Sequence, residues 1–201
     1  DIVQGLKGIL ADIENGTLHI DMEAEDIHTF IEGELTKRIG DNGKRLHTSR
    51  SRNDQVAVDI KLYLKKEVVN VKKLVVDLIK VIADKAEKYS ETVMPGYTHL
   101  QRAQPITFGH HLLAYGEMLL RDVSRLEDCL KRMDEMPLGS CALAGTTYPI
   151  DRTITAELLG FERITNNSLD GVSDRDYCIE FASVLSIIMV HLSRFSEEII
   201  M

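Results

Sequence analysis

The feature that most constrains the fold is a long stretch without a helix breaker. From Ser51 to about Tyr89 the chain contains neither glycine nor proline, and its apolar residues recur mostly three and four positions apart. These residues are Val56, Ile60, Tyr63, Val71, Leu74, Leu78, Ile82 and Tyr89. A helix of this length extends for roughly 55 Å at the usual rise per residue. Because such a helix is too long for a lone small domain, the stretch predicts a bundle of long helices.

Two further long helices are predicted towards the C-terminus. Their apolar residues step alternately four and three positions, the spacing of helices that cross at about 20° in bundles. One series is Leu119, Val123, Leu126, Leu130 and Met133, and the other is Phe181, Leu185, Ile188, Leu192, Phe195 and Ile199. The last helix is also apolar on its flanks, and a helix of that kind needs neighbours on several sides. We therefore predict an all-α fold, a long-helix bundle that other copies of the chain complete.

The first 50 residues predict shorter elements. One helix is expected to end near Asn15-Gly16, and a second to run from Glu23 to Ile39 and stop at Gly40, followed by a turn over residues 41–43. Thr17 to Asp21 is the best candidate for a strand, and a weak one. The chain starts without Met, and both of its ends lie inside helical patterns. We expect it to be an internal piece of a longer protein.

Composition narrows the class of protein. The 201 residues include 24 Lys and Arg against 32 Asp and Glu, a net charge of −8, which argues against a nucleic-acid partner. No apolar run approaches the roughly 18–20 residues of a membrane span. Cys129, Cys141 and Cys178 are odd in number and widely spaced, as expected for reduced thiols in the cytoplasm. We expect an acidic, soluble, cytoplasmic protein that binds no membrane.

Polar residues interrupt the helical pattern at the start of the longest helix. Ser51 or Asn53 is expected to cap this helix, and Arg50 and Arg52 flank the cap. Two guanidinium groups beside the free N–H groups of a helix N-terminus favour a carboxylate or phosphate. The alternative is an ordinary capped helix with solvated arginines.

A second polar stretch, residues 94–105, links the first two long helices. Pro95-Gly96 opens it and Pro105 closes it, so we expect a rigid loop with Pro105 in the first turn of the next helix. His99 is its only histidine and suits proton transfer near neutral pH. The alternative is a buried histidine that satisfies loop carbonyl groups.

Two later stretches favour structural interpretations. Residues 137–147 are rich in small side chains, which suits a tight helix connection or a nest of N–H groups, and they lack the pattern of a phosphate-binding loop. Residues 167–176 are expected to form a turn and a capped helix start. The adjacent His110 and His111 point about 100° apart on a helix, so they do not suit one metal ion. We predict no metal site.

Three of these stretches resemble a known family in their amino-acid sequences and in their order along the chain. They read His47-Thr-Ser-Arg-Ser-Arg-Asn-Asp-Gln55, Gly96-Tyr-Thr-His-Leu-Gln-Arg-Ala-Gln-Pro105 and Pro137-Leu-Gly-Ser-Cys-Ala-Leu-Ala-Gly-Thr-Thr-Tyr-Pro-Ile-Asp-Arg152. Together they resemble the argininosuccinate lyases of the fumarase/aspartase superfamily, over essentially the whole chain. The resemblance implies reversible cleavage of argininosuccinate to arginine and fumarate in arginine biosynthesis, without a cofactor. It also implies a homotetramer built on a central helical bundle, with each active site shared between three subunits.

The resemblance assigns roles to individual residues. Ser51, Arg52 and Asn53 match positions that bind the substrate carboxylate, and Thr98 resembles a second substrate-binding position. His99 matches the catalytic histidine of an acid–base pair. Asp26 resembles a contact to the arginine end of the substrate. Residues 1–50 then correspond to the remnant of an N-terminal helical domain, and residues 51–201 to the first part of the central bundle.

The sequence departs from the family in several places. The family's catalytic serine loop, Gly-Ser-Ser-x-Met-Pro-x-Lys-Lys-Asn-Pro, is absent from these residues and is expected beyond Met201. A substrate contact of the family's N-terminal segment is also missing, and Gly139 to Ala142 read Gly-Ser-Cys-Ala instead of Gly-Ala-Gly-Ala. We therefore expect the 201-residue chain to be inactive by itself.

Other functions remain open at this point. A sibling lyase would act on adenylosuccinate, aspartate or fumarate. A structural homologue such as a lens crystallin would have no activity. A helical scaffold would have no small-molecule site at all.

Overall fold

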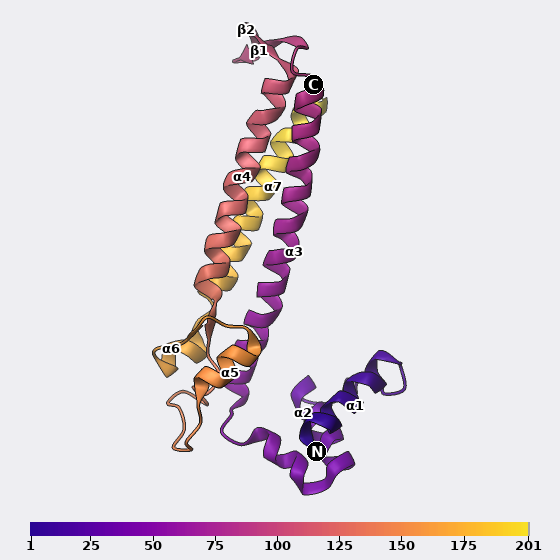
Figure 1. The fold of residues 1–201 in the computed structure, drawn as a ribbon, viewed down its shortest axis with the longest axis vertical. Helices are drawn as coiled ribbons and strands as arrows, with labels where there is room; N and C mark the ends of the chain where they lie inside the picture. Colours follow the sequence, from indigo (N-terminus) through magenta and orange to yellow (C-terminus); the bar gives the residue numbers. More distant parts are fainter. Residues whose placement is uncertain (201) are drawn as a thin grey trace.

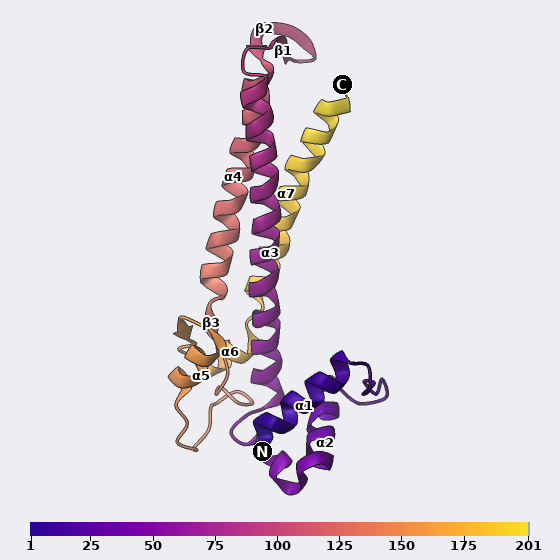
Figure 2. The ribbon, with the colours of Figure 1, turned by 45° about the vertical axis from the view of Figure 1, so that its right-hand side comes forward.

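Three long helices, α3 (Arg52–Lys88), α4 (Phe108–Met133) and α7 (Asp176–Ile200), run side by side and form the bundle (Figures 1 and 2). The computed structural model describes residues 1–200. Ser51 caps α3, and Asp54 completes a capping box, so the longest helix begins where its sequence predicted. The expected long-helix bundle is confirmed.

The core lies between the three long helices. Side chains seven residues apart share a helix face, and three such sets are buried together: Val68, Val75 and Ile82 from α3, Leu119, Leu126 and Met133 from α4, and Phe181 and Ile188 from α7. The α4 and α7 residues belong to the predicted series, but in α3 only Ile82 does, and Tyr63 and Leu74 of the predicted α3 series are exposed instead. This core fixes the two ends of the bundle relative to each other, and the polar stretches lie at those ends.

The outward face of α7 is apolar and exposed. Met189 is 61% exposed, Val190 58% and Ile199 70%. By length and composition α7 is also apolar enough to cross a membrane, which differs from the expectation that no such segment exists. This is weak evidence for a membrane span, because a helix that is covered by other helices has the same composition.

The link between α3 and α4 is a β-hairpin and not the expected loop. Strands β1 (Val93–Thr98) and β2 (Gln101–Thr107) pair antiparallel, and Pro105 pairs with Pro95 instead of opening α4. A two-stranded ribbon tolerates prolines because each strand has an unpaired edge. Thr107 caps α4 through the backbone N–H of His110, and the helix therefore starts at Phe108.

The N-terminal elements are α1 (Ile2–Glu14), α2 (Ile27–Ile39) and the 3-10 helix η1 (Gly40–His47). They contact one another and lie beside the start of α3 (Figure 1). Asp26 caps α2, so this helix begins later than the expected Glu23, and Thr17 to Asp21 form no strand. The predicted turn over residues 41–43 is part of η1. The division into domains 1–50 and 51–201 stays a prediction.

Short elements surround the same end of α3. They are β3 (Glu135–Met136), α5 (Arg152–Leu159), β4 (Arg163–Ile164) and α6 (Ser168–Ser173), with β3 and β4 paired in parallel. Met136, Ala156 and Phe161 form a small second core with Val58 of α3. This core holds the small-residue stretch 137–147 against the first turns of α3.

Candidate functional site

The first turn of α3 presents three of the predicted site residues in succession. The Ser51 hydroxyl oxygen accepts from the Asn53 backbone N–H at 3.3 Å, so Ser51 rather than Asn53 is the cap. The Asn53 side-chain amide is exposed and donates to the Ala142 carbonyl oxygen at 3.0 Å. The helix N-terminus therefore faces the stretch 137–147, and its partial positive charge favours an anion there.

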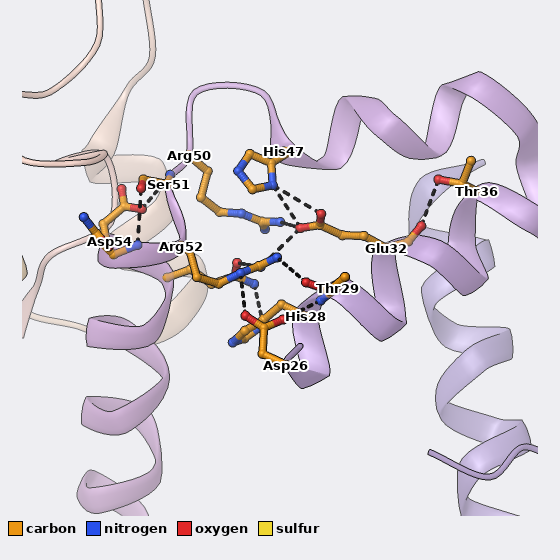
Figure 3. Close-up of polar contacts among 12 residues, drawn as sticks. Asp26, His28, Thr29, Glu32, Thr36, His47, Arg50, Ser51, Arg52 and Asp54 are labelled. Atoms are coloured by element: carbon orange, nitrogen blue, oxygen red, sulfur yellow. Dashed lines mark hydrogen bonds and ion pairs between the residues drawn. The ribbon is translucent and has the colours of Figure 1, made fainter. Parts of the chain in front are cut away.

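Arg52 is bound to two carboxylates of the N-terminal elements (Figure 3). Its Nε lies 2.9 Å from Asp26 Oδ2, and its Nη1 lies 3.3 Å from Glu32 Oε1. The same Nη1 donates to Gln55 Oε1 at 2.7 Å. The guanidinium group thus joins α2 to the start of α3.

Glu32 is the centre of this cluster. His47 Nδ1 lies 3.1 Å from its Oε1, and Arg50 Nη2 donates to the same oxygen at 3.3 Å. Burial pushes the pKa of Glu32 upward, but the hydrogen bond and charge of His47 and the charges of Arg52 and Arg50 outweigh it. The pKa of Glu32 is therefore lowered, and its carboxylate stays ionised in the folded protein.

Asp26 has a structural task in this arrangement. Its Oδ1 accepts from the Thr29 backbone N–H at 2.6 Å and so caps α2, while its other oxygen faces Arg52. The Thr29 N–H is the main cause that lowers the pKa of Asp26. The structure thus brings Asp26 and Arg52 together, as two of the residues that the sequence singled out.

A second series of hydrogen-bonded polar side chains lies beside the cluster around Glu32. Gln55 Nε2 lies 2.8 Å from His28 Nδ1, and His28 Nε2 lies 3.1 Å from Asp59 Oδ2. Burial raises the pKa of Asp59, against the charges of His28 and the nearby arginines. These residues tie α2 to the second turn of α3.

Apart from Asp26, sequence reasoning missed the contribution of α2 to this cluster. Asp26, Thr29, Glu32 and Thr36 are spaced three and four apart, so they share one face of the helix (Figure 3). A polar stripe on a short helix is most often a solvated face, and the pattern alone did not stand out. The signal in the sequence was this polar stripe on α2 together with two arginines at the start of the next helix.

Thr98 and His99 lie at the tip of the hairpin. Thr98 pairs with Gln101, so the turn consists of His99 and Leu100, with φ angles of 54° and 60°. Both are left-handed, the backbone of a type I′ turn, which is costly for residues other than Gly and Asn. His99 is exposed, so the alternative of a buried histidine is wrong.

A cavity of about 1200 Å³ lies under the hairpin. The strands line one side, and His111 and Glu117 of α4 and Glu198 of α7 line another. Thr98 and His99 belong to its rim. The cavity offers room for a small molecule beside His99, with both carboxylate and imidazole groups in its wall.

The two groups of site residues lie at opposite ends of α3 (Figures 1 and 2). The helix has 37 residues, so it separates Ser51 to Asn53 from the hairpin by roughly 55 Å. One copy of the chain therefore does not bring Asn53 and His99 into one site.

The stretch 137–147 forms a nest of backbone N–H groups, one of the two structures that its sequence predicted. The anion that this nest binds is a carboxylate of the same protein chain. The backbone N–H groups of Gly139 and Cys141 donate to the carboxylate of Asp54.

Within residues 1–200, no group of three His, Cys, Asp or Glu side chains is arranged to hold a metal ion.

Comparison with known proteins identifies the class. The model of a family described as lyase matches residues 1–201, and the chain belongs to that family. Argininosuccinate lyase of Desulforamulus reducens is 60% identical over 200 residues, which are 100% of this chain and 44% of that protein. Argininosuccinate lyase of Ruthia magnifica is 62% identical, over 100% of this chain and 42% of that protein. The resemblance to this group of lyases is confirmed, and the chain spans less than half of the length of these relatives.

Solved structures agree on the fold. EDDS lyase in complex with formate superimposes with a TM-score of 0.88 at 32% identity, over 98% of this chain and 39% of that one. The fumarate lyase:delta crystallin from Brucella melitensis bound to cobalt gives 0.72 at 23% identity, over 85% of this chain and 41% of that one, and supports the fold alone. The all-α lyase bundle that the sequence predicted is thereby confirmed.

Proposed function

We propose that the protein that contains this chain cleaves argininosuccinate to arginine and fumarate. The observation that carries the proposal is 60% identity to argininosuccinate lyases across the entire chain, including the three polar stretches. The proposed role is a step of arginine biosynthesis in the cytoplasm. The 201 residues alone are proposed to be inactive, since they lack the Gly-Ser-Ser-x-Met-Pro serine signature.

The chemistry explains why donors gather at the start of α3. A β-elimination removes a weakly acidic proton from the carbon beside a carboxylate, which gives a doubly charged aci-carboxylate, and then breaks the carbon–nitrogen bond. Preorganised donors stabilise such an intermediate. Ser51, Arg52 and Asn53 supply a hydroxyl, a guanidinium and an amide beside the positive end of a helix.

His99 is the proposed acid–base group of this chain. Its imidazole is exposed at the hairpin tip, beside a cavity, and histidine is the side chain that enzymes use most often for general acid–base catalysis. One proton must leave carbon, and another must reach the departing guanidino nitrogen. His99 handles one of these transfers and a serine outside the 201 residues the other, with Thr98 beside it to hold the substrate.

The same geometry supports the proposal of a homotetramer with shared active sites. Since α3 holds Asn53 and His99 apart, a complete site requires the α3 start of one copy and the hairpin of another. The exposed apolar face of α7 supports burial against other copies. No single chain then carries a whole site.

The proposal is tested on the full-length protein by following the absorbance of fumarate after argininosuccinate is added. His99→Asn should lower activity by about 10²–10⁴-fold, the usual loss for an acid–base group. Asparagine tolerates left-handed φ angles, so the hairpin turn is retained. His19→Asn, at an exposed histidine far along the chain from the hairpin, is the matched control and should keep full activity.

Each outcome has a defined meaning. A folded wild-type tetramer that releases no fumarate would overturn the activity and leave a structural homologue. Release of fumarate from adenylosuccinate in preference to argininosuccinate would assign a sibling lyase. Full activity of His99→Asn would leave the reaction in place and remove His99 from it.

A further inference from the structure

Asp54 is a fully buried carboxylate in the first turn of α3, with 0% of its surface exposed. Burial of a charge is expensive unless hydrogen bonds compensate for it. No ion pair within residues 1–200 includes Asp54. Its partners are backbone N–H groups instead.

Both carboxylate oxygens of Asp54 accept hydrogen bonds. Oδ1 accepts from the Ser51 N–H at 2.9 Å, within the capping box. Oδ2 accepts from the N–H groups of Gly139 at 2.9 Å and Cys141 at 2.7 Å. A single side chain thus binds the helix start to a loop more than 80 residues away in the sequence.

The loop is shaped to aim these N–H groups at Asp54. Gly139 has a φ of 92° and Cys141 one of 54°, so the chain turns sharply between them. Arg152 holds the turn from behind, because it donates to the carbonyl oxygens of Leu138 at 3.0 Å and Met136 at 3.2 Å. A Cβ at Gly139 would lie 2.8 Å from Arg152 Cγ, so the arginine packs directly on the turn.

The same loop fixes the side chain of Asn53. Ala142 follows Cys141, and its carbonyl oxygen accepts from the Asn53 amide at 3.0 Å. One N–H bond of that amide is thereby used, and the amide is held in one orientation at the exposed helix start. The position of Ala142 depends in turn on the two hydrogen bonds that Asp54 makes to this loop.

We propose that Asp54 is a positioning residue for substrate binding, which acts through the loop 139–142 to orient Asn53. The inference rests on the proposed function, since it requires Asn53 to contact the substrate. Asp54 itself touches no substrate, because it is buried behind the loop.

The test is a double-mutant cycle on the full-length enzyme with argininosuccinate, at a temperature well below unfolding. Asp54→Asn keeps the size of the side chain but turns one acceptor into a donor that faces N–H groups. We expect kcat/KM to fall by about 10–100-fold, the scale of a small displacement at a reacting site. Asn53→Ala should then cost much less in the Asp54→Asn background than in the wild type.

Separate measurement of KM and kcat distinguishes a positioning role from a loss of stability. If Asp54 acts through Asn53, the effect of Asp54→Asn should be divided between KM and kcat in the same way as the effect of Asn53→Ala. Loss of folded enzyme would instead lower the apparent kcat and leave KM unchanged. Asp77→Asn, which removes an exposed carboxylate paired with Lys80 on the same helix, is the matched control and should change neither constant.

Arg152→Lys keeps the test decisive if Asp54→Asn does not fold. Lysine retains the charge but lacks the planar fork, so the loop loosens while the Asp54 carboxylate stays. A smaller decrease in kcat/KM that is again coupled to Asn53→Ala supports the proposal. Additive effects in both cycles, with an active wild type, overturn it, whereas an inactive folded wild type overturns the proposed function instead.

Discussion

At the scale of single residues, Glu32 makes the clearest electrostatic contribution. Its side chain is 24% exposed and lies against Arg50, Arg52 and His47. Because its pKa is lowered in the folded state, it stabilises the fold above the ordinary carboxyl pKa, and this contribution is lost as the pH falls through the folded-state pKa.

Glu32→Gln should therefore destabilise the protein by about 1–3 kcal/mol at pH 7, the range for hydrogen bonds to charged groups. At about pH 3 more of the wild-type Glu32 is protonated than at pH 7, so the difference in melting temperature between the two proteins should be smaller there. Thermal unfolding at both pH values checks this. Glu67→Gln, at a carboxylate whose partner is the nearby Asn70, serves as the control and should show little difference at either pH. An equal loss for Glu32→Gln at pH 7 and pH 3 would contradict the electrostatic account.

At the scale of elements, the crossing of α3 and α4 depends on Gly109. A Cβ at this position would lie 2.4 Å from the Ala86 carbonyl oxygen and 3.0 Å from Ser90 Cα, so the two helices touch backbone to backbone there. Gly109→Ala should force the helices apart and lower the free energy of unfolding by about 1–3 kcal/mol. The hairpin with His99 begins at this crossing, so activity should fall with stability.

Gly116→Ala is the matched control on the same helix. Its Cβ would meet only Ile82 Cγ2, at 3.9 Å, which is ordinary contact. Alanine is a better helix former than glycine by about 1 kcal/mol, so this variant should be neutral or more stable. Urea denaturation of both variants measures the contrast, and similar losses for both would show that close approach is not what Gly109 provides.

The elements also differ in how far their sequences determine them. The long helices were predictable because helical periodicity repeats over many turns in α3, α4 and α7. The hairpin was not, since two prolines lie in its strands and its turn is His99-Leu100 instead of an Asn-Gly pair. The cap at Ser51 is a local signal, and it was predictable for that reason. The pairing of Arg52 with Asp26 and Glu32 depends on how α2 packs beside α3, and a single sequence does not state that.

At the scale of the whole molecule, the length of α3 governs where activity can arise. Asn53 and His99 lie at its two ends, with the buried core of three helices between them. The separation is fixed by a rigid helix, so no local movement brings the two residues together. The proposed function therefore predicts a complete site that draws them from different copies of the chain.

Mixing two inactive variants tests this directly. Full-length Asn53→Ala and His99→Asn proteins should each lose about 10²-fold or more of their activity, because each removes one part of every site. In hybrid oligomers refolded from an equal mixture, about a quarter of the sites should combine a wild-type Asn53 from one copy with a wild-type His99 from another. Fumarate release should recover in proportion. Thr98→Val mixed with His99→Asn is the control, since both changes lie on one hairpin and no hybrid site escapes them. Recovery in the first mixture and not in the second assigns the two ends of α3 to different subunits of one site. No recovery in either mixture, with hybrid oligomers present, would contradict the shared-site arrangement.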